Sequence, residues 1–360
     1  MSKKKKRIYK GHFDIAHMID YAKANNIAFV IAVSEDKQRG AGKTYSTAKY
    51  LYEHYLKDGE RFCMFVRNVK ELGNIAQGAL GAYFAKEHPD VTIYEKVQDK
   101  IFSYIYAQTG TGKEKHAEVI GFVACLKAAQ TIKNYRGILE SSNIQYFWFD
   151  EFQPLDGKYL SNETGKNGLM KTIIDTVNGE VEYKTVVLTS NTISIGNPYF
   201  QMLKLGGRIQ SNTRSLTTDT CVYENVTVEG LAEKHTESAI NKAFGAYGDD
   251  YTSNVWLADD NSLVARPENW GAPIYICAIV YNSTYYGVYC YPSVGLYFIS
   301  TNWDKSSPYV YSLTLDGDLN IPLLKTNKTI CRLRDWFYQG IVRCANGTIQ
   351  RMLLDVFGNS

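Results

Sequence analysis

Hydrophobic positions in the first two-thirds of the chain follow two alternating spacings. Short apolar runs are typical of buried strands, and apolar residues three and four positions apart are typical of helices. The predicted strands span residues 27–33, 61–67, 144–151 and 184–191, and the predicted helices span residues 12–25 and 44–57. This alternation predicts an α/β fold with a mainly parallel sheet, in which ligands bind beyond the carboxyl ends of the strands.

Two runs depart from this pattern, because residues 101–107 and 117–124 alternate apolar and polar positions on either side of a polar loop. The alternation predicts a β-hairpin. The loop contains a Gly-Thr-Gly-Lys run that ends at Lys113 and superficially resembles a phosphate-binding loop. Glu114 stands where such a loop needs Ser or Thr, and a strand follows where a helix is required. We therefore predict a simple turn here.

The composition changes again after residue 205. Residues 206–270 are rich in Gly, Asn, Asp, Thr and Ser, and they contain a predicted helix around 230–244. From residue 271 the pattern predicts a three-stranded meander, followed by amphipathic helices near 325–356. The predicted domains accordingly span residues 1–205, 206–270 and 271–360.

The first chemical motif lies between the strand at 27–33 and the helix at 44–57. The loop there ends in Gly42-Lys43-Thr44, which is the layout of a P-loop. In a P-loop, main-chain N–H groups surround a polyphosphate, the Lys reaches the terminal phosphates and the Thr hydroxyl binds Mg²⁺. We predict that ATP and Mg²⁺ are bound by a segment comprising Arg39, Gly40, Ala41, Gly42, Lys43, Thr44 and Tyr45.

Two positions in this loop leave a question open. Lys37 stands where the first glycine of the motif is usual, so we expect an altered path of the loop with retained chemistry. Arg39 either contacts the γ-phosphate or projects into solvent, and the sequence favours neither alternative.

A second motif, Asp150-Glu151, ends the apolar strand at 144–151. An NTPase needs one acidic residue to bind Mg²⁺ and another to activate water, and two adjacent acids at the end of a buried strand can fill these roles. We predict that Asp150 holds Mg²⁺ together with Thr44, and that Glu151 is the catalytic base that polarises the attacking water. Because Glu151 is present, hydrolysis is favoured over simple nucleotide binding.

Asn191 ends a third apolar strand. An amide at this place can orient the attacking water or detect the γ-phosphate, and we predict a catalytic role for it beside Lys43 and Glu151. The alternative is an asparagine that only initiates a turn.

The overall composition restricts the class of protein. The chain has 360 residues, of which 45% are hydrophobic and 21% charged, as in ordinary globular proteins. No apolar run approaches the roughly 20 residues that span a bilayer, and no apolar signal core follows the basic N-terminus. Seven cysteines are scattered without pairs, which argues against a disulfide framework and a zinc site. We therefore expect a cytoplasmic protein.

The net charge is only +3, but basic residues gather in two places. One is the first ten residues, which hold six basic side chains, and the other is the predicted C-terminal helices. Either a solvated segment or contact with a nucleic-acid backbone explains such clusters, and the predicted hairpin loop is a second candidate for contact with DNA. The candidates for nucleic-acid contact are Lys113, Lys115, Lys325, Lys328, Arg332 and Arg334.

With these residues placed, the chain resembles the DNA-packaging motor ATPases of small phi-29-like podophages, which are relatives of terminase large subunits. The resemblance is carried by Arg39-Gly-Ala-Gly-Lys-Thr44, by Phe149-Asp-Glu-Phe152 and by Asn197-Pro-Tyr-Phe200. It implies an ATPase domain over residues 1–205, a small linker domain over 206–270 and an RNase-H-like domain of α+β type over 271–360.

The resemblance also implies a homo-oligomeric ring, commonly a pentamer, at the portal of a procapsid in the host cytoplasm. Such a ring drives double-stranded DNA inward with ATP, and a structural RNA at the portal is a further expected partner. Motors of this class complete their site with a cation from the neighbouring subunit. The candidates for that cation are Lys133, Arg136, Lys184 and Arg208. Lys184 lies on a strand where the group has an arginine-rich run, which leaves the identity of this residue open.

A terminase with both ATPase and nuclease activity is the main alternative. A nuclease of this kind needs clustered carboxylates for two metal ions, and the first predicted strand of the C-terminal domain has none. We therefore predict no nuclease activity. A nucleotide-gated adaptor without turnover is disfavoured by Glu151, and a helicase is disfavoured because no second ATPase-like lobe follows residue 210.

Overall fold

A computed structural model divides the chain into two units. The first comprises residues 1–193 and 211–255, and the second comprises residues 194–210 and 256–360. The structure describes residues 8–35, 38–110, 112–154, 159–160, 162–165, 167–178, 183–193, 197–205, 208–209, 213–238, 263–281, 283–313, 321 and 328–357.

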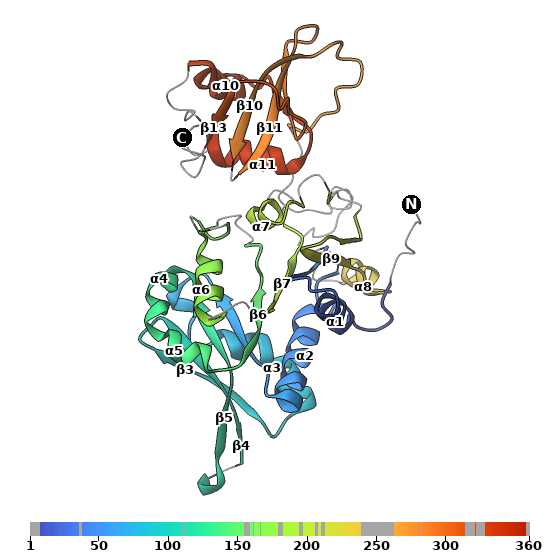
Figure 1. Cartoon of the computed structure of the whole chain (residues 1–360). Helices are drawn as coiled ribbons and strands as arrows, with labels where there is room; N and C mark the ends of the chain where they lie inside the picture. The colour runs from blue at the N-terminus through green and yellow to red at the C-terminus, as the bar shows by residue number, and fades with distance from the viewer. Residues whose placement is uncertain are drawn as a thin grey trace. The chain divides into compact units, whose positions relative to one another are not determined.

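The first unit is built on one sheet (Figure 1). Its strands are β1 (Phe29–Ser34), β2 (Arg61–Val66), β3 (Thr92–Gln98), β4 (Phe102–Thr109), β5 (His116–Cys125), β6 (Ile144–Asp150), β7 (Thr185–Asn191), β8 (Ser215–Thr217) and β9 (Cys221–Val226). Within the described residues the sheet has nine strands in the order β3-β4-β5-β2-β6-β7-β1-β9-β8.

The central strands of this sheet are parallel, and antiparallel strands close both edges. The parallel pairs run continuously from β5 through β2, β6, β7 and β1 to β9. β3 and β4 pair antiparallel at one edge, as do β8 and β9 at the other. Strands that are covered on both faces read as continuous apolar runs, which explains the sequence of β1 and β6. The predicted mainly parallel α/β fold is confirmed.

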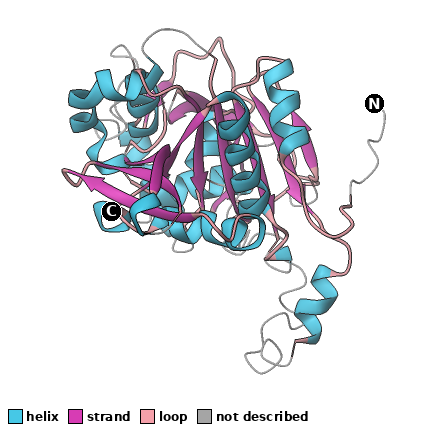
Figure 2. Cartoon of the chain, turned by 90° about the horizontal axis from the view of Figure 1, so that it is seen from below, coloured by secondary structure: helices cyan, strands magenta, loops and turns pink. Residues whose placement is uncertain are grey.

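Helices flank the strands of this sheet (Figure 2). They are α1 (Ala16–Ala24), α2 (Lys43–Asp58), α3 (Ile75–Glu87), α4 (Ala129–Ile132), α5 (Arg136–Glu140), α6 (Leu169–Asn178) and α8 (Leu231–Glu237). One apolar core joins α1, α2 and α3 to inward-facing residues of the central strands, among them Val30, Met64 and Trp148. On α2, buried Thr47, Ala48 and Leu51 have the spacing of a helix that packs along one side. Among the described residues, no helix is long and apolar enough to cross a membrane.

β4 and β5 form the predicted hairpin. They pair antiparallel from Phe102 to Thr109, and Figure 1 shows the hairpin extending beyond the rest of the first unit. A single turn of 3-10 helix (Gly112–Glu114) precedes β5, so no helix follows the Gly-Thr-Gly-Lys run. The prediction that this run is a simple turn is confirmed.

The structure corrects the sequence-based domain division at two places. The described residues 197–205, which we assigned to the ATPase domain, belong to the second unit. β8 and β9 lie within residues 206–270, which we assigned to a linker, yet β9 pairs with β1 inside the main sheet. The polar composition of this region concealed a strand, Cys221–Val226, whose residues are all buried. The predicted helix around 230–244 corresponds to α8, which ends at Glu237, and residues 239–244 lie outside the described residues.

The second unit contains a smaller mixed sheet. Its elements are α7 (Pro198–Met202), β10 (Ile274–Tyr281), β11 (Thr284–Tyr291), β12 (Leu296–Ser300), β13 (Val310–Ser312), α10 (Lys328–Tyr338), β14 (Val342–Cys344) and α11 (Gly347–Phe357). The described strands follow the order β13-β10-β11-β12-β14, with the predicted meander at the centre. Leu333 of α10 and Met352 and Leu353 of α11 are buried in the same core as β10 and β12.

Close packing between β2 and β5 generates a stability prediction. A Cβ atom at Gly121 of β5 would lie 2.8 Å from the carbonyl oxygen of Phe62 and 3.1 Å from its ring. Because both groups belong to a paired strand, neither can move freely. We expect Gly121→Ala to lower the free energy of unfolding by about 1–3 kcal/mol, measured by urea denaturation.

Gly81→Ala is the matched control. Gly81 lies within α3, and its Cβ would meet no atom within 4 Å. Alanine there should raise stability by about 0.5–1 kcal/mol because glycine is a poor helix former. Equal effects of the two substitutions would contradict the packing argument.

Candidate active site

The P-loop connects β1 to α2 and is held by the main chain around it. Gly42 has φ 97°, a left-handed conformation that favours glycine, and α2 begins at the next residue. The carbonyl oxygen of Ala41 accepts a hydrogen bond from the N–H of Phe13, and the side chain of Gln38 accepts one from the N–H of Val228. Lys37 lies outside the described residues, so its effect on the loop stays a prediction.

Lys43 is directed toward the ends of two neighbouring strands. Its side chain is buried, and its Nζ donates to Ser34 Oγ at the end of β1 and to Asn191 Oδ1, 3.4 Å away, at the end of β7. Burial lowers the pKa of Lys43 to about 8, although the negative charges of Glu151 and Asp150 oppose this shift. The ammonium therefore lies in a poorly solvated place where its charge acts strongly on a ligand.

Asp150 is fixed by two hydroxyl groups. Its Oδ2 accepts from Thr44 Oγ1 at 2.9 Å, and its Oδ1 accepts from Thr189 Oγ1 at 2.6 Å. Thr189 in turn accepts from the indole N–H of Trp148, so the carboxylate belongs to an ordered network. Burial raises the pKa of Asp150, while the two hydroxyls and Lys43 lower it.

Glu151 follows Asp150 in an uncommon backbone conformation. Its φ is 51°, in the left-handed region that non-glycine residues rarely adopt, and its side chain is exposed. Desolvation and then the charge of Asp150 raise the pKa of Glu151, whereas Lys43 and Arg39 lower it. A carboxylate with a raised pKa binds a proton more strongly than an ordinary glutamate, which suits a general base.

Strand register explains why these side chains meet. In the parallel sheet Ser34 pairs with Asn191, and Asp150 pairs with Thr189. All four residues lie at the carboxyl ends of β1, β6 and β7. Open α/β sheets bind their ligands on this side, beyond the carboxyl ends of the strands. The structure thus brings Lys43 and Thr44, the first residues of α2, together with the strand-end residues Asp150 and Asn191.

Two further residues of the predicted loop have other surroundings. The Tyr45 ring packs edge-on against Tyr83, and its hydroxyl donates to Glu87 of α3. Its main-chain N–H therefore stays the candidate for phosphate contact. The Arg39 side chain is exposed, and its charge lowers the pKa of both Lys43 and Glu151, which places it within electrostatic range of the site.

The four candidate trans-acting cations belong to different parts of the chain. Lys133 and Arg136 are exposed in the segment that precedes β6, and Arg136 pairs with Glu140. Lys184 precedes the first residue of β7, so it lies at the amino end of the strand that ends in Asn191. Arg208 is exposed in the second unit.

The candidates for nucleic-acid contact are described only in part. Lys115 is exposed at the tip of the hairpin, and Arg332 and Arg334 are exposed on α10. The side chains of Lys113 and Lys328 and the whole of Lys325 lie outside the described residues.

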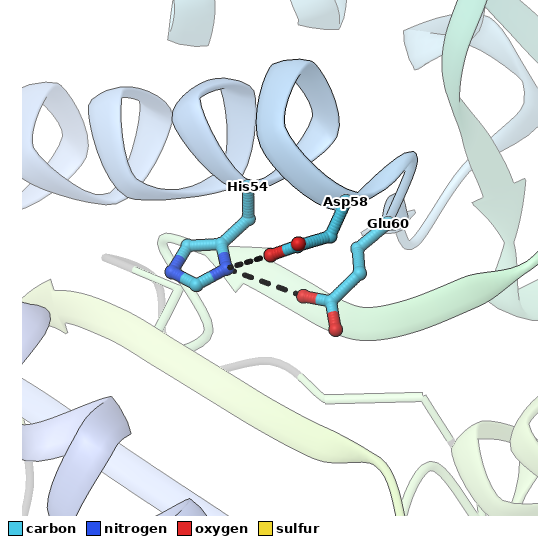
Figure 3. Close-up of side chains that lie close together, drawn as sticks. All are labelled: His54, Asp58 and Glu60. Carbon is cyan, nitrogen blue, oxygen red and sulfur yellow. Dashed lines mark ion pairs between the residues drawn. The ribbon is translucent and has the colours of Figure 1, made fainter.

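A separate charged cluster lies at the opposite end of α2 (Figure 3). His54 Nδ1 is 3.8 Å from Asp58 Oδ2 and 3.3 Å from Glu60 Oε2. These three side chains are close enough for one metal ion, but Glu60 already accepts from the Tyr146 hydroxyl and pairs with Lys23. Because a histidine near a helix C-terminus is also favoured by the helix dipole, we assign the cluster to an ion-pair network of α1, α2 and β6.

Sequence analysis missed several residues of the site. Ser34 and Thr189 bind the predicted side chains of Lys43 and Asp150, Trp148 binds Thr189, and Arg67 contacts the main chain at Glu151. Ser34 and Thr189 lie at strand ends, a signal that could have revealed them. Nothing local in the sequence connects Arg67 to a residue 84 positions away.

This fold and these side chains define a P-loop ATPase. The model of the family described as podovirus DNA encapsidation protein (Gp16) matches residues 12–359, and the chain belongs to that family.

Known relatives agree with this assignment. The chain is 26% identical over 331 residues to the DNA packaging protein of Bacillus phage phi29, covering 89% of this chain and 91% of the relative. It is 25% identical over 335 residues to the DNA packaging protein of Bacillus phage B103, covering 89% and 94%. Its fold is similar to a chain of the bacteriophage phi-29 viral genome packaging motor assembly, with TM-score 0.63, 23% identity and coverage of 96% and 98%.

The lowered pKa of Lys43 predicts how nucleotide binding depends on pH. Below about pH 8 the ammonium is charged, and above that value the unliganded protein loses this charge. We expect the affinity for ATP to fall by up to about tenfold per pH unit between about pH 8 and the ordinary pKa of lysine, because binding then requires proton uptake.

Calorimetric titration in two buffers of different ionisation enthalpy measures both affinity and proton uptake. Lys43→Met should weaken binding and abolish the proton uptake. An affinity that stays constant across this pH range would contradict the prediction.

Proposed function

We propose that this chain is the ATP-hydrolysing subunit of a homo-oligomeric ring that drives double-stranded phage DNA into a procapsid. The chain is a DNA packaging motor ATPase, in keeping with its family and with the curated name of its phi29 relative. One structural observation carries the catalytic part of the proposal. Lys43 and Thr44 of the P-loop form hydrogen bonds with Asn191 and Asp150, which lie at the carboxyl ends of β7 and β6.

The proposed division of work follows from the chemistry of each side chain. Lys43 binds the β- and γ-phosphates of ATP, and the main-chain N–H groups of residues 40–45 surround them. Glu151 holds the attacking water and takes its proton. Asn191 contacts Lys43 and is placed to respond to the γ-phosphate, while Arg39 acts on the same region through its charge.

Thr44 and Asp150 are suited to hold Mg²⁺. A hydroxyl and a carboxylate lie side by side with a 2.9 Å contact, and these oxygen groups are the ligands that Mg²⁺ prefers. Mg²⁺ bound there would neutralise negative charge on the phosphates. Thr189 keeps the Asp150 carboxylate oriented from its other oxygen.

The remaining parts of the proposal concern assembly. We propose a pentameric ring at the procapsid portal in the host cytoplasm, in which a neighbouring subunit supplies a cation to each site. Lys133, Arg136, Lys184 and Arg208 remain the candidates. Arg136 requires release from Glu140 before it could act in this way.

We also propose that the second unit is an RNase-H-like domain that contacts DNA or a structural RNA. Its mixed five-stranded sheet with helices α10 and α11 is compatible with that fold. Arg332 and Arg334 are exposed on α10, where they could meet phosphates, and Lys115 on the hairpin is a second contact candidate.

Replacing the proposed base tests the function directly. Glu151→Gln keeps the size of the side chain but removes the proton acceptor, so we expect kcat for ATP hydrolysis to fall by about 10²–10⁴. ATP binding, measured by calorimetry, should persist. Wild-type hydrolysis should increase when double-stranded DNA is added, and particle sizing should show an oligomer. A wild-type rate for Glu151→Gln, or a monomer without DNA stimulation in every nucleotide state, would refute the motor proposal.

The absence of nuclease activity is a separate prediction. β10, the first strand of the sheet in the second unit, has no acidic residue, and the described part of that unit holds no cluster of three potential metal ligands. Asp304 is engaged locally with Ser306. We expect no nicking of supercoiled plasmid with Mn²⁺ or Mg²⁺, and nicking by purified protein would favour the terminase alternative.

A further inference from the structure

Arg67 lies directly after β2 and binds two successive main-chain carbonyl groups, those of Glu151 and Phe152. Its Nη1 donates to the carbonyl oxygen of Glu151 at 3.3 Å, and its Nη2 donates to the carbonyl oxygen of Phe152. The guanidinium also lies over the Phe149 ring, 4.6 Å from its centroid. One side chain thus contacts three of the four residues from Phe149 to Phe152.

Glu163 fixes the orientation of this guanidinium. Its two carboxylate oxygens accept from Arg67 Nε at 3.0 Å and from Nη2 at 2.7 Å, which is a bidentate pair. The two side chains are only 12% and 1% exposed. Glu163 Oε2 also accepts from the N–H of Leu160, so the carboxylate is itself held by the segment before α6. Such a pair has one geometry, and lysine cannot reproduce its fork.

The turn that Arg67 binds needs external support. Glu151 adopts φ 51°, a conformation that a non-glycine residue keeps only when surrounding contacts impose it. From the β7 side, the carbonyl oxygen of Thr189 accepts from the N–H of Phe152. From the β2 side, Arg67 supplies the two carbonyl contacts. Main-chain direction at Glu151 decides where its carboxylate lies relative to Lys43.

We infer that Arg67, oriented by Glu163, is a positioning residue that holds the backbone of Glu151 so that its carboxylate faces the phosphate-binding loop. This inference rests on the proposed role of Glu151 as the base. Arg67 acts through Glu151 rather than on the nucleotide, because Glu163 and the two carbonyl groups engage four of its five N–H donors. Small displacements of a catalytic group cost up to about 10²-fold in rate, so the effect is measurable.

Steady-state hydrolysis by the oligomeric protein tests the inference. We expect Arg67→Lys to lower kcat at least about tenfold while KM for ATP changes less than about threefold, because binding residues are untouched. Glu163→Gln should have the same effect in weaker form, since it leaves the arginine in place without its anionic partner.

Arg61 offers a matched control on the same strand. It too donates to two main-chain carbonyl oxygens, those of Val119 at 2.7 Å and Ser142 at 3.0 Å, but it lies at the amino end of β2. Arg61→Lys should keep kcat within about twofold of wild type. Thermal unfolding and particle sizing of each variant verify that folding and assembly are retained.

A double-mutant cycle separates positioning from general structural support. If Arg67 acts through Glu151, adding Arg67→Lys to Glu151→Gln should lower kcat by less than about threefold further. A further tenfold loss would overturn the inference, as would a normal kcat for Arg67→Lys alone. A normal rate for Glu151→Gln would instead refute the proposed base, so the two failures are distinguishable.

Discussion

The parallel pairing of β1, β6 and β7 is the constraint on which the site depends. Neighbouring parallel strands lie about 4.8 Å apart, so side chains at their carboxyl ends are neighbours without further arrangement. The register places Ser34 beside Asn191 and Asp150 beside Thr189. A slip of one residue would turn each of these side chains to the opposite face. The side chains of β1 and β6 are closely packed on both faces, so such a slip would force the core to repack. The core that stabilises the sheet therefore also sets the geometry of the site.

The pKa shifts of Lys43 and Asp150 follow from the same arrangement of strand ends. Lys43 enters from the first residue of α2 and is buried between strand ends, which lowers its pKa to about 8. Asp150 experiences the opposite shift, and two hydroxyls limit it. Burial thus makes both charged groups sensitive to whatever charge is brought beside them. A polyphosphate complements the positive charge of Lys43, and a divalent cation complements the negative charge of Asp150.

Support for the catalytic turn comes from outside the P-loop. Arg67 directly follows β2 and Glu163 precedes α6, and their ion pair connects these two segments to the residues after β6. A buried bidentate pair contributes little net stability compared with apolar packing, because both charges lose their hydration. The effect of the pair is to specify one conformation of the backbone at Glu151 and Phe152. Such a pair is reasonable where backbone direction matters more than added stability.

The sequence by itself determined the apolar strands, the hairpin and the P-loop, because each depends on the residue types and spacing within a short segment. It also placed Asp150 and Asn191 at the carboxyl ends of predicted strands and Lys43 in the loop after another, and in a parallel sheet these positions lie on one side. Only the tertiary structure decided that Cys221–Val226 joins β1, and that Arg67 and Glu163 pair across 96 positions. A polar, turn-rich context concealed the strand, and an ion pair of that separation leaves no periodic signal. Its geometry arises only when β2, β6 and the segment before α6 are packed together.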